Sequence, residues 1–111
     1  MRTLPDTVAQ QTASSNTAAA GSDCVITLTA VADEQHVLDW LAWSYDADPT
    51  SGSLTVVDTT NSITHFTVAI TAAGPGIFNF AERGLRCAKN ATIVITLGGT
   101  VGAKRLSLQR R

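Results

Sequence analysis

The chain has 111 residues, of which 44% are hydrophobic and 15% are charged, and its formal net charge is −1. This length and composition predict one globular domain with a single core and exclude a disordered chain. No apolar run approaches the roughly 20 residues that cross a bilayer, and the first residues lack the basic and apolar regions of a signal peptide, so we expect a soluble protein made inside a cell, with no membrane partner.

Residues 1–23 are rich in Ala, Thr, Ser, Gln and Asn and contain no aromatic residue. A segment of this composition cannot bury enough apolar surface to fold by itself. We interpret it as a polar N-terminal arm that is either free or held by a partner. Its sizeable apolar side chains, by which it would dock, are Leu4, Pro5 and Val8.

Beyond the arm, residues 24–111 read as short β-segments separated by turn residues. Residues 25–30 alternate β-branched side chains and predict the first strand. Residues 36–45 are also compatible with a helix capped by Asp33, but their aromatic residues and the turn signal at 46–52 favour a strand.

The remaining chain repeats the same pattern of short apolar runs and turns. In residues 63–70 the face that carries Phe66, Val68 and Ile70 is the better core face. Seven or eight such strands predict an all-β fold, a single antiparallel β-sandwich or jelly roll. Further strands are expected at 54–57, 77–80, 91–97 and 103–108, turns at 58–62, 73–76 and 98–99, and an irregular connection at 82–90.

Candidate chemistry is sparse. Cys24 and Cys87 are the only thiols, and without a secretion signal we interpret them as buried and reduced. Nothing in the spacing of Cys and His resembles a zinc site. Asp46, Asp48 and Asp58 flank a hairpin without the pattern of a calcium loop, so turn formation explains them better. We therefore expect no enzymatic activity, no cofactor and no metal.

Charge is distributed unevenly along the sequence. Residues 1–58 hold all the acidic residues except Glu82, with Arg2 as their only base, and every charge after Glu82 is positive. Either the molecule has an acidic and a basic surface that suit a complementary neighbour, or a sandwich interleaves early and late strands and mixes the signs. The second interpretation is simpler. Basic residues without interleaved aromatic residues argue against a nucleic-acid partner.

Trp40 and Trp43 are an odd number of residues apart on one predicted strand, so they should point to opposite faces. One of them is expected in the core. The other can contact a partner or a sugar, because aromatic side chains dominate both kinds of contact. Arg110 and Arg111 would add a peripheral electrostatic contribution at the C-terminal end.

Four segments carry a family resemblance: Trp43-Ser44-Tyr45, residues 49–56 (PTSGSLTV), residues 73–78 (AGPGIF) and residues 90–97 (NATIVITL). They look like the small jelly-roll proteins encoded among the head genes of tailed phages. The length and the polar arm resemble the decoration, staple or cement proteins that bind outside the capsid of short-tailed phages of the epsilon-fifteen type. The resemblance covers roughly residues 24–108.

The resemblance implies a structural virion protein on the capsid surface of a bacteriophage, made in the host cytoplasm. Many copies would tie neighbouring major capsid proteins together, with homodimers forming on the shell and avidity arising from several contacts. The expected contacts are Leu4, Pro5, Val8, one of Trp40 or Trp43, and Arg110 with Arg111. The alternative is a carbohydrate-binding or tail-associated β-module with Trp43 and Tyr45 as a stacking platform, and a small hydrolase that uses His65 ranks third.

Overall fold

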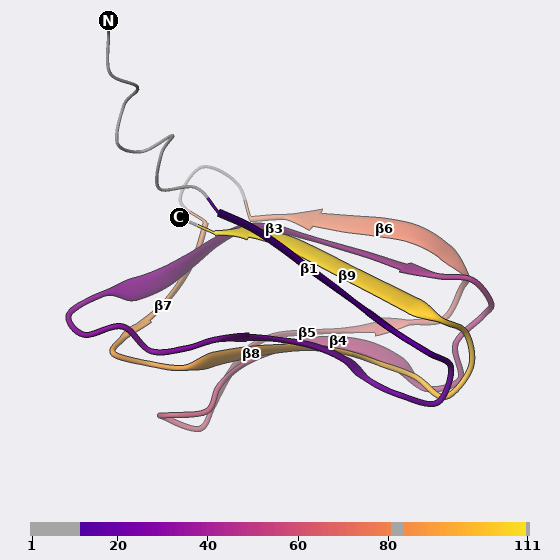
Figure 1. Cartoon of the computed structure of the whole chain (residues 1–111), viewed down its shortest axis with the longest axis horizontal. Coiled ribbons are helices and arrows are strands. Elements are labelled where there is room, and N and C mark those ends of the chain that lie inside the picture. Colours follow the sequence, from indigo (N-terminus) through magenta and orange to yellow (C-terminus); the bar gives the residue numbers. More distant parts are fainter. Residues whose placement is uncertain (1–11, 81–83, 111) are drawn as a thin grey trace, which may run out of the picture.

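The computed structural model describes residues 12–80 and 84–110, without the side chains of residues 12 and 13. Within these ranges the chain forms nine β-strands and no helix, and hence no helix that could span a membrane. The strands make two antiparallel sheets that pack face to face (Figure 1). The predicted all-β sandwich is therefore confirmed.

Each sheet is assembled from strands far apart in the sequence. The five-stranded sheet has the order β1-β9-β3-β6, and β7 pairs with the first part of β3. Its strands are β1 (Thr12–Ala18), β3 (Gln35–Tyr45), β6 (Gly74–Asn79), β7 (Leu85–Lys89) and β9 (Lys104–Arg110). The four-stranded sheet has the order β2-β8-β4-β5 and contains β2 (Cys24–Leu28), β4 (Gly52–Asp58), β5 (Ile63–Ile70) and β8 (Ile93–Gly98).

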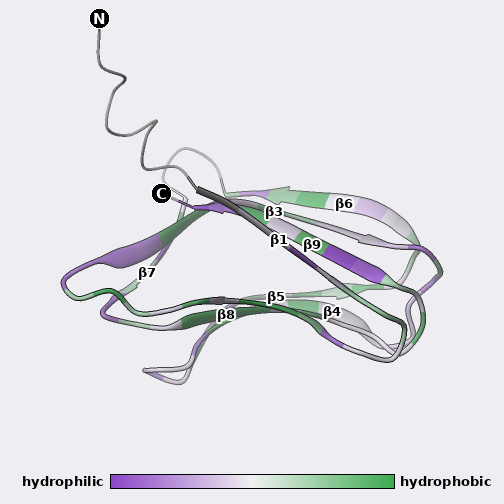
Figure 2. Cartoon of the chain, in the orientation of Figure 1, coloured by the Kyte–Doolittle hydropathy of each residue, from purple (hydrophilic) through white to green (hydrophobic). Residues whose placement is uncertain are grey.

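The core lies between the sheets and is built from every second side chain of the central strands. On β4, β8 and β9 buried residues alternate with more exposed ones. Figure 2 shows the hydrophobic section along β8, and a further one in β6, where Ile77 and Phe78 are exposed. Tyr45 links the two sheets: it lies on β3, and its hydroxyl donates a hydrogen bond to the carbonyl of Gly98, the last residue of β8, at 2.6 Å. Side chains with no exposed surface include Leu38, Leu41, Leu54, Val56, Ile93, Ile95, Leu97, Leu106 and Leu108.

The local predictions agree best where the apolar period is clean. The strand predicted at 63–70 has the same bounds in the structure, and the ambiguous segment 36–45 is a strand. Late strands lie between early ones in both sheets, as the interleaving interpretation of the charges predicted. Cys24 and Cys87 are buried and not joined by a disulfide.

Three segments differ from the prediction. Residues 12–18 of the predicted arm form strand β1, which pairs with β9 along its whole length. The irregular connection 82–90 contains β7, which pairs with the start of β3. The turn predicted at 73–76 already belongs to β6, where Gly74 faces Tyr45. These segments lack a strong apolar alternation, and their main-chain hydrogen bonds to distant strands decide their conformation.

We expect Asp58 to contribute to the acid sensitivity of the fold. Its side chain is buried at the end of β4, and its two carboxylate oxygens accept hydrogen bonds from the Asn61 side-chain amide and the Asn61 backbone N–H, both at 2.8 Å. The Asn61 side chain is the main cause that lowers the pKa of Asp58. A carboxyl group with a lower pKa in the folded state stabilises the fold above its unfolded pKa, and the stabilisation is lost as pH falls through the folded pKa.

We therefore expect Asp58→Asn to lower the free energy of unfolding at about pH 6 and to lose less stability than the wild type between about pH 6 and pH 2. Urea unfolding at both pH values measures this difference. Asp33→Asn, in an exposed turn, is the matched control and should keep the acid response of the wild type. An unchanged acid response in Asp58→Asn would contradict the assignment.

Candidate docking surface on the outer sheet face and the β6 edge

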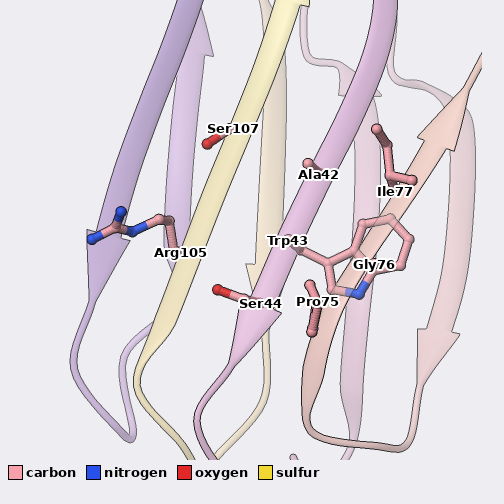
Figure 3. A pocket seen from close by; sticks show the side chains of 8 residues that line it. All are labelled: Ala42, Trp43, Ser44, Pro75, Gly76, Ile77, Arg105 and Ser107. Atoms are coloured by element: carbon pink, nitrogen blue, oxygen red, sulfur yellow. The ribbon is translucent and has the colours of Figure 1, made fainter.

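A shallow pocket of about 420 Å³ lies on the outer face of the five-stranded sheet (Figure 3). Small side chains on β3 and β9 leave room at its centre: Ala42 faces Ser107 across the two strands, and Ser44 lies opposite the longer Arg105. Their neighbours on the same strands point into the core, so this set faces outward. The complete lining, called the outer-face pocket below, is Ala42, Trp43, Ser44, Pro75, Gly76, Ile77, Arg105 and Ser107.

The pocket is apolar on one side and polar on the other. Pro75 and Ile77 form the apolar side on β6, and Ile77 is 64% exposed. Arg105 lies on the opposite side and extends away from Trp43 (Figure 3). A second depression of about 530 Å³ shares Ser44 and Arg105 with the outer-face pocket and continues toward the end of β1 and the start of β9. Two adjoining open depressions on one sheet face suit a large partner better than a small enclosed ligand.

Trp43 supports β6 from the inner side of the sheet. It faces the fully buried Leu106 on β9 and packs against the core. Across the other neighbouring strand it faces Gly76, and a Cβ atom added there would lie 2.5 Å from two carbons of the indole. Glycine at position 76 is therefore the residue that lets the ring lie close against β6, and the indole holds this part of the pocket wall in place.

β6 is an edge strand with an exposed apolar surface. Among the described strands it pairs only with β3. Ile77 is 64% exposed and Phe78 is 42% exposed. The ring of Phe78 lies 4.8 Å from that of Phe66 on β5 and 5.0 Å from that of Phe80, measured between centroids. The three phenylalanines thus close the opening between the two sheets at this side, and part of their surface stays in contact with water.

The free side of β6 presents main-chain groups as well. The Phe80 N–H donates to the Asp39 carbonyl at 3.0 Å, on the β3 side. In an antiparallel pair, residues that hydrogen-bond to the neighbouring strand alternate with residues that do not. Phe80 bonds to β3, so the residues at every second position before it also bond to β3, and the residues in between direct their main-chain N–H and C=O groups to the open edge. These residues are Pro75, Ile77 and Asn79. Pro75 has no N–H to offer, which is the usual position of proline in an edge strand.

The structure places only some of the residues predicted as contacts. Trp40 and Trp43 lie on opposite faces, as predicted: Trp43 packs against the core, and Trp40 faces Gln109 on the outer side. Arg110 is half-buried at the end of β9. The predicted contacts Leu4, Pro5, Val8 and Arg111 lie outside the described residues. Ile77 and Arg105 were not predicted as contacts, because their exposure depends on the tertiary arrangement of the strands.

The predicted stacking platform of Trp43 and Tyr45 is wrong. Tyr45 is 3% exposed and its hydroxyl is bonded to Gly98, while Trp43 faces inward. Both side chains belong to the core side of β3, so neither ring offers an open face on the outer side of the sheet. A sugar bound to this face would have to contact the outer-face pocket instead.

The thiols and acidic groups of the described residues do not form a reactive cluster. Burial raises the pKa of the Cys87 thiol to about 11, and the charge of Asp58 contributes. Burial also raises the pKa of Cys24. Both thiols are therefore protonated at neutral pH, and a protonated thiol is a poor nucleophile. Within the described part of the chain, no three His, Cys, Asp or Glu side chains are grouped as a metal site requires.

No protein-family model and no curated protein matches the chain. Solved structures resemble it at low sequence identity. Drosophila NLP-core, a structure reported for pentamer formation and histone binding, has a TM-score of 0.54 and 15% identity over 90% of this chain and 95% of that chain. A structure from Bacillus endospore appendages, which are disulfide-linked pili, has a TM-score of 0.49 and 12% identity over 90% and 83%. A family 16 carbohydrate-binding module has a TM-score of 0.44 and 9% identity over 82% and 70%. At these identities the likeness concerns the β-sandwich fold alone.

Proposed function

We propose that the chain is a structural decoration protein of a phage head, which docks on the major capsid protein through the outer-face pocket. The observation that carries the proposal is the open pocket of about 420 Å³ with an apolar wall on one side and Arg105 on the other. Such a surface accepts a protruding side chain of a protein partner, and well-packed anchors of this kind supply most of the affinity at protein interfaces.

Two of the four sequence segments that resemble phage proteins lie at the outer-face pocket, which supports its assignment as the docking site. Two of the four segments, residues 43–45 and 73–78, contribute Trp43, Ser44, Pro75, Gly76 and Ile77 to the outer-face pocket. Residues 49–56 and 90–97 lie mostly in β4 and β8, in the other sheet. The resemblance therefore includes part of the outer-face pocket as well as strands that form the core.

Filling the pocket tests the proposal. Ala42 is half-buried on the pocket side of β3, so Ala42→Trp should occupy the pocket without disturbing the core. We expect the wild type to co-sediment saturably with capsids that lack their outer accessory protein, and imaging should show added density at regular lattice positions. Ala42→Trp should raise the dissociation constant about tenfold or more, because a blocked anchor pocket removes most of the interface energy.

Ala69→Trp is the matched control, because Ala69 is exposed on β5 in the other sheet. It should bind capsids like the wild type. Equal binding by Ala42→Trp and Ala69→Trp would exclude the outer-face pocket as the docking site. If the wild type itself fails to bind capsids, the decoration function fails as well.

A carbohydrate-binding function remains the second candidate, because the outer-face pocket also combines hydroxyl groups with an apolar wall. Ser44 and Ser107 could hydrogen-bond to a sugar whose ring contacts Pro75 or Ile77,. Glycan binding by the isolated chain that Ala42→Trp abolishes and Ala69→Trp preserves would favour this function. The absence of binding on a glycan array, together with saturable capsid binding, would exclude it.

A further inference from the structure

We propose that β6 pairs with β6 of a second copy of this chain, antiparallel and about a two-fold axis centred on Ile77. Among the described strands, β6 is an open edge of the five-stranded sheet, and its sequence GPGIFN carries no charge. Exposed, uncharged and apolar edge strands readily pair with another strand. Because antiparallel pairing of identical strands uses the same patch on both copies, it closes on itself as a dimer and does not continue into a fibre.

The open main-chain groups of β6 fit this register. With Ile77 on the axis, the Ile77 N–H of each copy donates to the Ile77 carbonyl of the other. The Asn79 N–H of each copy then donates to the Pro75 carbonyl of the other. The missing N–H of Pro75 would face the Asn79 carbonyl, at the end of the pair where water can serve as the donor. Because Pro75 lacks an N–H, a longer strand that paired with this edge would lose a hydrogen bond there, whereas the short pairing proposed here remains possible.

The side chains of β6 gain contacts in the same arrangement. Ile77 of each copy would lie beside its symmetry mate on the outer face. At 64%, Ile77 is the most exposed large hydrophobic side chain in the described part of the chain. Phe78, on the inner side and 42% exposed, would approach the second copy below the sheet. Pairing would therefore cover apolar surface that the monomer leaves in water, and such burial is the main favourable term in association.

The charges that flank β6 select the antiparallel orientation. Asp48 accepts a hydrogen bond from the Ala73 N–H at 2.7 Å, which fixes its carboxylate near the first end of β6. Ala73 lies four residues before Ile77, about 13 Å along the strand. On the other side of the axis, a point about 13 Å beyond Ile77 lies beside Leu38 of β3. Leu38 pairs with Leu85, the first residue of β7, and the next residue of β7 is the exposed Arg86. Antiparallel pairing thus brings Asp48 of one copy toward Arg86 of the other.

Sedimentation equilibrium of the full chain over a range of concentrations tests the pairing. We expect a monomer–dimer equilibrium for the wild type, and Ile77→Lys should raise its dissociation constant about tenfold or more, because a lysine on an edge strand opposes pairing. Val101→Lys replaces another exposed side chain (42%) and should dimerise like the wild type. A wild type that stays monomeric, or an Ile77→Lys variant that dimerises as well as Val101→Lys, would overturn the proposal.

Cross-linking tests the position of the axis. Residues that face each other in a hydrogen-bonded antiparallel pair have Cα atoms about 5.5 Å apart, which a disulfide can span. Ile77→Cys should therefore form a disulfide-linked dimer under mild oxidation, whereas Val101→Cys should not. The native Cys24 and Cys87 are buried and do not compete. Equal cross-linking of the two variants would contradict an axis at Ile77.

A double-mutant cycle tests the charge contact. Asp48→Asn keeps an oxygen acceptor for the Ala73 N–H and removes the charge, and Arg86→Gln removes the opposite charge. Each variant should weaken dimerisation a few-fold, and the double variant should be no weaker than the single ones, because they lose the same contact. Full additivity would overturn the register. Since no capsid is present in these assays, their outcome is independent of docking through the outer-face pocket.

Discussion

Replacing Leu41 by alanine is expected to lower the free energy of unfolding by about 2–5 kcal/mol, the range found for large-to-small substitutions in well-packed cores. Leu41 has no exposed surface, and on β3 it faces Leu108 of β9 and Phe78 of β6. The truncated side chain would leave a cavity directly behind the outer-face pocket. Since a domain of this kind is stabilised by roughly 5–15 kcal/mol in total, the loss would be a large fraction of it.

Urea unfolding of the wild type and Leu41→Ala, followed by circular dichroism, measures the effect. Val25→Ala is the matched control, because Val25 is 37% exposed on β2 and its truncation leaves no enclosed cavity. It should change the free energy of unfolding by less than about 1 kcal/mol. A Leu41→Ala variant as stable as Val25→Ala would mean that the inner face of β3 is not packed against the other sheet as described.

The second large effect is expected for Gly76→Ala. The added Cβ would lie 2.5 Å from Cε2 and Cζ2 of Trp43 and 2.7 Å from Nε1, well inside normal contact distance. The indole is packed against the core, so it can move only by disturbing its neighbours or by lifting β6. Overpacking of this kind costs about 1–3 kcal/mol. We also expect a changed tryptophan emission spectrum, because the environment of Trp43 would change.

Gly98→Ala provides the control for this substitution. A Cβ atom at Gly98 would find its nearest neighbours, Asp23 Oδ1 and Ser53 Oγ, at 3.4 Å. The Gly98 carbonyl that accepts the Tyr45 hydroxyl would also remain. Stability and emission spectrum should therefore stay close to those of the wild type. If both alanine variants behave alike, the indole does not lie against β6.

The effect at Gly76 extends to function, because the same glycine lines the outer-face pocket. A displaced indole would shift β6, and with it Pro75 and Ile77. We therefore expect Gly76→Ala to impair both capsid docking and β6 pairing, whereas Ala42→Trp should impair docking alone and Arg86→Gln should impair pairing alone. The two surfaces share β6, and Ile77 belongs to both: its side chain forms part of the apolar wall of the outer-face pocket, and its main-chain groups lie at the axis of the proposed pairing.

Local sequence was informative wherever the side chains alternate with a period of two. Residues 63–70 alternate cleanly, and the strand was predicted with its true bounds. The same period placed Trp40 and Trp43 on opposite faces. It did not tell which of them faces the core, because the register of β3 shifts between Leu38 and Trp40, and such a bulge exchanges the inward and outward positions that follow it.

By itself the sequence determined the all-β class, the sandwich and most of the strands, since these depend on alternation and turn residues that act over a few positions. Only the tertiary structure decided that the polar residues 12–18 form β1 and that Leu85–Lys89 form β7, because their hydrogen-bond partners are distant in the sequence. It also decided the candidate site. The outer-face pocket requires β3, β6 and β9 side by side, and the open edge of β6 exists because no other described strand reaches it.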